Sequence, residues 1–229
     1  MESRLRDLAV EALFPRFCAS CKREGALMCE TCLGYWTPVP KPASCGFCGT
    51  SGSARTCGRC REHVYLDGLS AFAPYANPVL RSLIGSWKYH RDQSVEPVFK
   101  RFLRQGQPYM APPAHAWHVT SVPLHVRRAR VRGFDQAAQV GQWTASLYGL
   151  PHQTLLRRTV HTLPQAGQEG RQVGELDAVF DLVPGIEVPE NVLLCDDVFT
   201  SGATMDACAR VLKEAGAKQV WGYVLAKGG

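Results

Sequence analysis

The chain has 229 residues, a formal net charge of +6 at neutral pH and a hydrophobic fraction of 45%. This length suits one ordinary domain with a small attachment, and the apolar content is sufficient for a packed core. No run of about 18 apolar residues occurs, which argues against a transmembrane helix.

The first predicted element is a short helix over residues 5–13. Leucine and alanine recur there at helical spacing, and charged residues alternate with them. The segment lacks the apolar core of a signal peptide. We therefore expect a cytoplasmic protein without a membrane span.

Eight of the ten cysteines form four C-x-x-C pairs in the first quarter of the chain. Two intervening residues let both thiolates of a pair reach one tetrahedral ion. Seven, twelve and eight residues separate successive pairs. The short gaps favour one zinc site at Cys18, Cys21, Cys29 and Cys32 and a second at Cys45, Cys48, Cys57 and Cys60. An interleaved scheme, in which the first pair joins the third, is a live alternative.

Four thiolates leave no open coordination position, so we interpret both zinc sites as structural. A disulfide framework is the rival, and a reducing cytoplasm disfavours it. Redox activity is conceivable for one pair, but four successive pairs lack a thioredoxin-like context. Residues 37–44 are predicted to be a linker between the two halves. We expect residues 1–62 to form this zinc module and residues 63–229 the second domain.

From Leu69 onward, strands and helices alternate. We predict strands at 69–75, 117–122, 192–194 and 218–227, helices at 78–90, 94–106, 133–149 and 205–216, and a loop at 107–116. This alternation predicts right-handed βαβ units and a parallel sheet. Ligands of such sheets lie at the carboxyl ends of the strands, so the loops after Val122 and Cys195 are expected to face one pocket.

The most informative motif, VLLCDDVFTSGAT, spans residues 192–204. A short apolar strand is predicted to end in Asp196 and Asp197. A loop of small residues and the N-terminus of a helix then follow, and such helix termini bind phosphate. The loop residues are Thr200, Ser201, Gly202, Ala203 and Thr204. Hydroxyls add donors, and glycine lets the backbone approach the anion closely.

The two carboxylates of this motif cannot serve a phosphate, because like charges repel. They can accept hydrogen bonds from a vicinal diol or hold a divalent metal. A phosphate site beside a diol acceptor predicts a ribose 5-phosphate ligand. The alternative is a plain strand-to-helix turn with a capping residue, but one cap needs only one such residue.

Cys195 and Cys208 stand apart from the zinc ligands. Cys195 precedes the carboxylate pair, whose charge is expected to raise the pKa of the thiol. Cys208 falls on the predicted buried face of the following helix. Both are interpreted as packing residues.

The 192–204 segment resembles the ribose-phosphate loop of type I phosphoribosyltransferases. Almost the whole chain resembles the ComF family, competence-associated proteins with a double zinc ribbon and a phosphoribosyltransferase-like domain. The resemblance rests on the four C-x-x-C pairs, SWKYHRD, VPLHVRRARVRGFDQA, LPQAGQEGR and VLLCDDVFTSGAT. It implies an α/β parallel-sheet domain, with residues 63–116 as a hood, attached to a small zinc-ribbon module.

The resemblance also implies roles for individual residues. Asp196 and Asp197 would receive the ribose hydroxyls directly or through Mg²⁺, and residues 200–204 would hold the 5-phosphate. The basic segment containing Arg127, Arg128, Arg130 and Arg132 would close over the pyrophosphate of phosphoribosyl pyrophosphate, because guanidinium groups bind phosphate oxygens in bidentate fashion. A solvated basic turn is the alternative for this segment.

Further positions are candidates for contact with the ligand. Lys88 is a candidate anion contact, with solvation on a helix surface as its equal rival. Arg128 and Arg132 join the two aspartates as catalytic candidates. Asp135 and Glu175 replace asparagines that are usual in the family, whereas Gln136 and Arg171 are retained and would either reach across the pocket or cap helices.

Two functions follow. The first is a phosphoribosyltransferase that displaces pyrophosphate with an unknown acceptor. The second is a single-stranded-DNA-binding factor in DNA uptake, with Trp36 and Trp87 as exposed aromatics beside the zinc knuckles. A transferase fold that senses its ligand without turnover is a third possibility.

Overall fold

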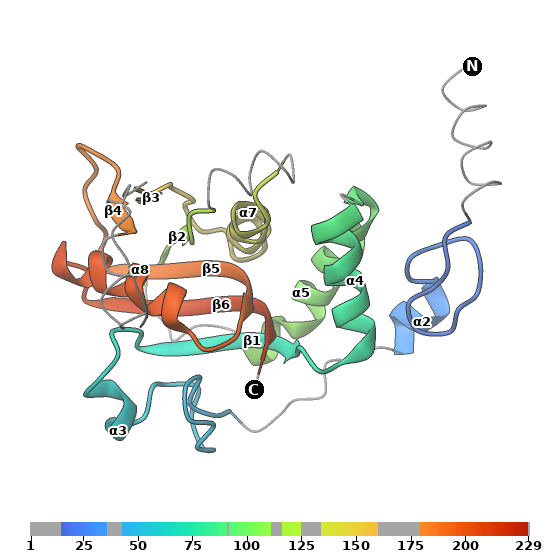
Figure 1. Ribbon diagram of the computed structural model, residues 1–229, viewed down its shortest axis with the longest axis horizontal. Coiled ribbons are helices and arrows are strands. Elements are labelled where there is room, and N and C mark those ends of the chain that lie inside the picture. Colours follow the sequence, from blue (N-terminus) through green and yellow to red (C-terminus); the bar gives the residue numbers. More distant parts are fainter. Residues whose placement is uncertain are drawn as a thin grey trace, which may run out of the picture.

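The computed structural model describes residues 15–35, 43–90, 92–110, 116–124, 134–159 and 179–228. Within them, a parallel sheet lies between helices, and two cysteine-bearing modules flank it (Figure 1). The helix expected over residues 5–13 and most of the linker expected at 37–44 lie outside these ranges.

The central sheet has four parallel strands in the order β1-β6-β5-β2. These strands span Gly68–Pro74 (β1), Gln219–Lys227 (β6), Asn191–Phe199 (β5) and His118–Ser121 (β2). β5 pairs along both edges, with Leu193 opposite Trp221 of β6 and Leu194 opposite Thr120 of β2. A strand buried on both faces requires the apolar run seen in the sequence. The expected α/β class with a parallel sheet is thus confirmed.

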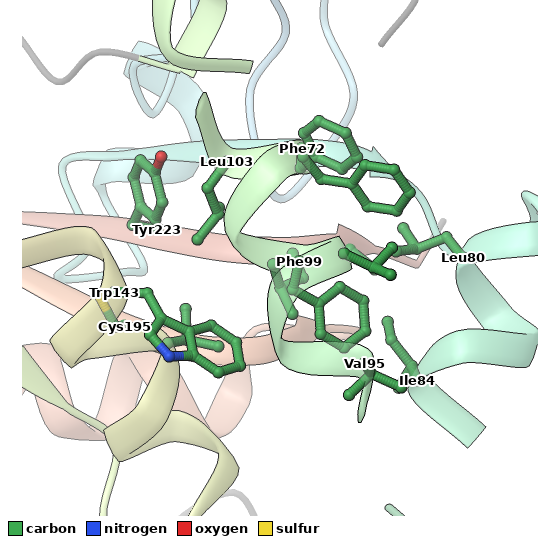
Figure 2. Packing of buried hydrophobic residues seen from close by; sticks show 14 of the residues in the cluster. Phe72, Leu80, Ile84, Val95, Phe99, Leu103, Trp143, Cys195 and Tyr223 are labelled. Atoms are coloured by element: carbon green, nitrogen blue, oxygen red, sulfur yellow. The ribbon is translucent and has the colours of Figure 1, made fainter. Parts of the chain in front are cut away.

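One face of the sheet is covered by the helices α5 and α7, with α4 beside them. These span Pro78–His90 (α4), Glu96–Met110 (α5) and Gln136–Tyr148 (α7), and a 3-10 turn over Gln93–Val95 joins the first two. Phe99 and Trp143 pack there against Cys195 and Tyr223 of the sheet (Figure 2). The burial of such large aromatic side chains contributes strongly to the core.

Trp87 of α4 is completely buried in this core and stacks on Trp143 at a ring-centroid distance of 5.5 Å. Its proposed role as an exposed aromatic for nucleic acid is therefore wrong. The helical spacing of α4 places position 87 on the same face as Leu80, Leu83 and Ile84, which are also buried. Trp36 lies outside the described residues.

The other face of the sheet carries α8, Ala203–Glu214, and a two-stranded antiparallel ribbon. The ribbon consists of β3, Leu156–Arg158, and β4, Phe180–Leu182. Val192 and Leu194 of β5 share a second apolar cluster here with Met205, Cys208 and Leu212 of α8. Cys208 is a packing residue, as predicted.

Three local predictions were incomplete. β5 does not end at the acidic pair but pairs with β6 as far as Phe199, opposite Lys227. α5 continues to Met110, so the part of the predicted loop at 107–110 is helical. The β3–β4 ribbon was not predicted, because strands of three residues carry no clear alternation. Among the helices that the structure describes, none is sufficiently long and apolar to cross a bilayer.

Candidate functional site

A cavity of about 450 Å³ opens at the carboxyl ends of β2 and β5. Residues of β1, α4, β2, α7, β3, β5 and α8 or of the loops beside them line it, which brings together residues that are distant in the sequence. The lining comprises Tyr75, Lys88, Val122, Pro123, Leu124, Gln136, Ala137, Arg158, Asp196, Asp197, Val198, Thr200 and Thr204. The two loops expected to face one pocket, after Val122 and after Cys195, do meet here.

The acidic pair lies within the last part of β5, and strand geometry sends its two side chains in different directions. Cys195 belongs to the core under α5 and α7, and Leu194 to the core under α8. Because successive side chains alternate between faces, Asp197 continues on the Cys195 side and Asp196 on the Leu194 side. Both still reach the cavity, since they stand at its rim.

Lys88 forms an ion pair with Asp197 across the cavity wall. Its Nζ lies 2.7 Å from Asp197 Oδ2, and the two side chains are only 15% and 10% exposed. Lys88 is therefore not a solvated residue of the helix surface. Since the pair is largely removed from water, each charge depends on the other for its stability.

Asp196 has a strongly perturbed carboxyl group. Burial, together with the charge of Asp197, raises the pKa of Asp196 to about 8, although Lys88 acts in the opposite direction. The Oδ1 atom of Asp196 accepts a hydrogen bond of 2.8 Å from the backbone N–H of Asp197. Burial is the larger of the two causes, and the neighbouring charge of Asp197 is the second.

Asp135 is the N-cap residue of α7. Its Oδ1 accepts a hydrogen bond of 3.0 Å from the backbone N–H of Ala138. Burial raises its pKa, and Asp197 adds to this effect. Gln136 follows as the first residue of the helix and lines the cavity, so Asp135 takes the capping role considered for Gln136.

The loop between β5 and α8 has the geometry of an anion site. Gly202 caps α8 with φ of 83°, and Thr204 lies in the first turn of this helix. Thr200 and Thr204 line the cavity together with the acidic pair. The N-terminus of α8, with the positive end of its dipole, therefore lies beside the cavity that the two carboxylates line.

Other predicted ligand residues take different places. Ser201 and Ala203 are exposed and Gly202 is buried, and none of the three lines the cavity. The basic segment with Arg127, Arg128, Arg130 and Arg132 lies outside the described residues, as do Arg171 and Glu175. Roles for these residues stay predictions.

Arg158 and Tyr75 line the cavity and were not predicted. Arg158 belongs to β3, and its guanidinium lies over the ring of Phe180 at 5.2 Å from the centroid. A guanidinium in a cavity with a helix N-terminus is suited to an anionic ligand. The only local sequence signal is an arginine pair after a buried leucine, which is too common to single out a site.

The eight predicted zinc ligands form two clusters in the sequential grouping. Cys18, Cys21, Cys29 and Cys32 make one, and Cys45, Cys48, Cys57 and Cys60 make the other; within each, all sulfur atoms lie within 4.8 Å of one another. The interleaved alternative is not formed.

Both cysteine clusters fit a zinc ion by their chemistry. Each has four thiol groups, the donor set of structural zinc. Backbone N–H groups of Cys29 and Cys57 donate to the sulfur atoms of Cys18 and Cys45 at 3.4 and 3.5 Å. The hydroxyl of Thr50 lowers the pKa of Cys48 to about 6, which favours the thiolate that binds metal.

The raised pKa of Asp196 predicts a pH-dependent stability. The folded state binds this proton more tightly than the unfolded state, so its contribution is present below pH 4 and is lost as the pH rises towards about 8. Asp196→Asn removes this titration. We compare the free energy of unfolding of the variant with that of the wild type at each pH, and we expect the difference to favour the variant by on the order of 2 kcal/mol more at pH 8.5 than at pH 5.5. Urea unfolding in magnesium-free buffer measures this.

Asp181→Asn is the control for the pH experiment. The hydrogen bond from Arg157 lowers the pKa of Asp181, so this group does not titrate between these pH values. An equal effect of Asp196→Asn at both pH values would contradict the prediction.

The chain is similar to three curated competence proteins, and no protein-family model matches it. It is 25% identical to competence protein ComFC of Streptococcus pneumoniae over 73% of this chain and 71% of that protein. It is 27% identical to competence protein F of Haemophilus influenzae over 85% and 90%. It is 26% identical to ComFC of Bacillus subtilis over 61% and 56%.

Among solved structures, the chain has a likeness to phosphoribosylpyrophosphate synthetase of Mycobacterium smegmatis. The TM-score is 0.31 and the identity 18%, over 58% of this chain and 33% of that one. This score is too low to bear on the fold or the function.

Proposed function

We propose that this chain, a ComF family protein of α/β parallel-sheet class, binds phosphoribosyl pyrophosphate or another ribose 5-phosphate group in the cavity at the carboxyl ends of β2 and β5. One observation carries the proposal. The carboxylates of Asp196 and Asp197 and the first turn of α8 open into the same cavity of about 450 Å³. The carboxylates would accept hydrogen bonds from the ribose hydroxyls, and the helix N-terminus would bind the 5-phosphate.

The residues have distinct tasks in this proposal. Thr200, Thr204 and the backbone N–H groups at the start of α8 hold the 5-phosphate. Asp196 accepts hydrogen bonds from the ribose hydroxyls, while the ion pair with Lys88 holds Asp197 in place. Arg158 also lines the cavity, and its guanidinium would contact a second anionic group of the ligand.

Mg²⁺ fits the carboxylate end of the cavity. It prefers oxygen ligands, and the carboxyl groups of Asp196 and Asp197 both line the cavity there. Asp196 and Asp197 would hold the ion, and a bound Mg²⁺ would neutralise charge on a departing pyrophosphate. Two structural zinc ions at the cysteine clusters complete the metal content that we propose.

Isothermal titration with phosphoribosyl pyrophosphate and Mg²⁺ tests the binding. We expect heat from the wild type and an affinity at least about tenfold lower for Thr204→Val, since the cavity loses one donor. Thr154→Val is the matched control, because Thr154 is exposed and does not line the cavity. Absence of heat with the wild type would rule the proposal out. If the wild type binds, release of pyrophosphate in the presence of candidate acceptor bases distinguishes a transferase from a ligand sensor.

A role with single-stranded DNA is the second candidate, and the surface of the first cysteine module favours it. Tyr35 is 84% exposed there, and Arg16, Lys22 and Arg23 are exposed on the same module. Aromatic rings that stack on bases and cations that contact phosphates are the usual means of holding a single strand. The relatives named as competence proteins are compatible with such a role in DNA uptake.

The salt dependence of oligonucleotide binding tests this second candidate. With about three phosphate contacts, we expect the dissociation constant to rise about ten- to twentyfold between 50 and 200 mM salt. Tyr35→Ala should weaken binding at every salt concentration, whereas Tyr89→Ala, exposed on α4, serves as the control. Absence of binding at 50 mM salt would remove the candidate.

A further inference from the structure

The first halves of the two cysteine modules, residues 17–25 and 44–52, are repeats of one another with the same spacing between corresponding residues, whereas the gap to the second C-x-x-C pair is seven residues in one module and eight in the other. Lys22 and Gly49 occupy the same place after the first C-x-x-C pair; both have positive φ, and their N–H groups bond to the carbonyls of Cys18 and Cys45 at 2.9 and 3.0 Å. Isolated antiparallel bridges recur at the same offset, Phe17 with Glu24 and Ser44 with Ser51. The modules are therefore built alike, and differences between them indicate separate tasks.

The repeats differ within the first C-x-x-C pair. The first module has Ala19 and Ser20 there, and the second has Gly46 and Phe47. Gly46 is buried, and a Cβ at this position would lie 3.0 Å from Leu69 of β1. The absence of a side chain at 46 lets the second module approach the sheet closely, and position 47 then carries an aromatic ring towards it.

Phe47 contacts both ends of the short loop that precedes α8. Its ring lies edge-on to Phe199 at a centroid distance of 5.5 Å. A Cβ built at Gly202 would lie 2.8 Å from the ring of Phe47 and 2.4 Å from that of Phe199. Phe199 is the last residue of β5 and Gly202 the cap of α8, so the two rings enclose the backbone at both ends of residues 200–201.

Further bonds join this module to the same region. Lys227 Nζ donates to the carbonyl of Cys45 at 3.3 Å. Asp206, in the first turn of α8, accepts bonds from the N–H groups of Tyr65 and Leu66 at 2.7 and 3.0 Å. The start of α8 is thus tied both to the second module and to the chain that leaves it.

The first module makes its contacts elsewhere. Arg101 of α5 forms an ion pair with Glu30 at 2.9 Å, and Gln105 of α5 donates to the carbonyl of Leu33 at 3.3 Å. Ser20, which corresponds to Phe47, is exposed. Similar modules are therefore attached to different parts of the domain.

We propose that the second cysteine module positions the ribose-phosphate loop, with Phe47 as the positioning residue that holds Phe199 and the backbone of Gly202. This inference rests on the proposed function. Thr200, Ser201 and Ala203 are exposed and supply little packing of their own, so the loop takes its conformation from its two ends. Zinc at the second cluster fixes the knuckle that carries Phe47, and the loop is thereby preorganised for a phosphate.

Phe47→Ala tests the role of the ring, with zinc content, hydrogen exchange and titration as readouts. We expect two zinc ions per chain, faster amide exchange at residues 199–205, and an affinity for phosphoribosyl pyrophosphate with Mg²⁺ at least about tenfold lower. Phe47→Leu should restore part of both effects. Phe17→Ala, which removes a 52% exposed ring from the first module, should change neither.

Loss of a single zinc ion gives a second comparison. Cys48→Ser and Cys21→Ser are each expected to lose one zinc, but only Cys48→Ser should accelerate exchange at 199–205. The inference is overturned by wild-type exchange at 199–205 in Phe47→Ala, or by the same acceleration in Cys21→Ser. Amide exchange is measured without ligand, so the two proposals can fail separately. A wild type that does not bind phosphoribosyl pyrophosphate refutes the proposed function. Accelerated exchange at residues 199–205 in Phe47→Ala still supports the positioning role of Phe47 in that case.

Discussion

Lys88→Met is expected to lower the free energy of unfolding by about 3–5 kcal/mol. Methionine keeps the apolar stem and removes the ammonium group, so the carboxylate of Asp197 stays buried beside Asp196 without its cation. Breaking a buried pair in this way costs more than the pair itself contributes, because a charge is left uncompensated. Chemical denaturation of the variant measures the effect.

Asp197→Asn in the Lys88→Met background is expected to recover much of this loss, because the double variant has no unpaired charge. Lys100→Met is the matched control, since Lys100 pairs with Glu96 at 2.6 Å but both side chains are more than a third exposed. Exposed pairs contribute about 0.2–1 kcal/mol. Equal losses for the two methionine variants, or no recovery in the double variant, would contradict the buried role of Lys88.

Gly202→Ala is expected to destabilise the protein by about 2–5 kcal/mol and to weaken binding of phosphoribosyl pyrophosphate at least about tenfold. The left-handed backbone at φ of 83° costs an alanine about 1–2 kcal/mol. Its Cβ would also lie 2.4 Å from Phe199 and 2.8 Å from Phe47, and such overpacking costs about 1–3 kcal/mol. Denaturation and titration of the same variant measure both effects.

Gly149→Ala separates these two causes. Gly149 ends α7 in the left-handed region, with φ of 65°, but nothing lies within 4 Å of an added Cβ. It should therefore cost only the backbone part, about 1–2 kcal/mol, without loss of ligand affinity. A loss of stability as large as that of Gly202→Ala would show that the ring contacts do not matter.

Features that depend only on neighbouring residues along the chain could be predicted from the sequence. The strands of the main sheet were predictable because each is a short apolar run before or after a helical pattern. The zinc ligands were predictable because a thiolate pair must sit two residues apart to reach one ion. The acidic pair, the small residues after it and the helix N-terminus follow one another directly, so their joint chemistry was visible without coordinates.

Contacts between distant segments were not predictable. No pattern indicated that Lys88 meets Asp197, that Phe47 lies against Gly202, or that Arg158 lines the cavity. The short β3–β4 ribbon has too few residues to show alternation. Trp87, predicted to be an exposed aromatic, is fully buried. These contacts and the burial of Trp87 depend on how the helices pack on the sheet, that is, on which face of each element is turned towards its neighbour.

The sequence by itself determined the α/β class, the eight cysteines of the two clusters and the polar groups of residues 192–204. Only the tertiary structure decided how they combine: which four cysteines share a cluster, which carboxylate has a lysine, and what encloses the loop at 200–201. The reason is physical. Spacing along the chain sets local geometry, whereas charge pairing and ring contacts between segments far apart in the sequence are settled by the packing of the whole core.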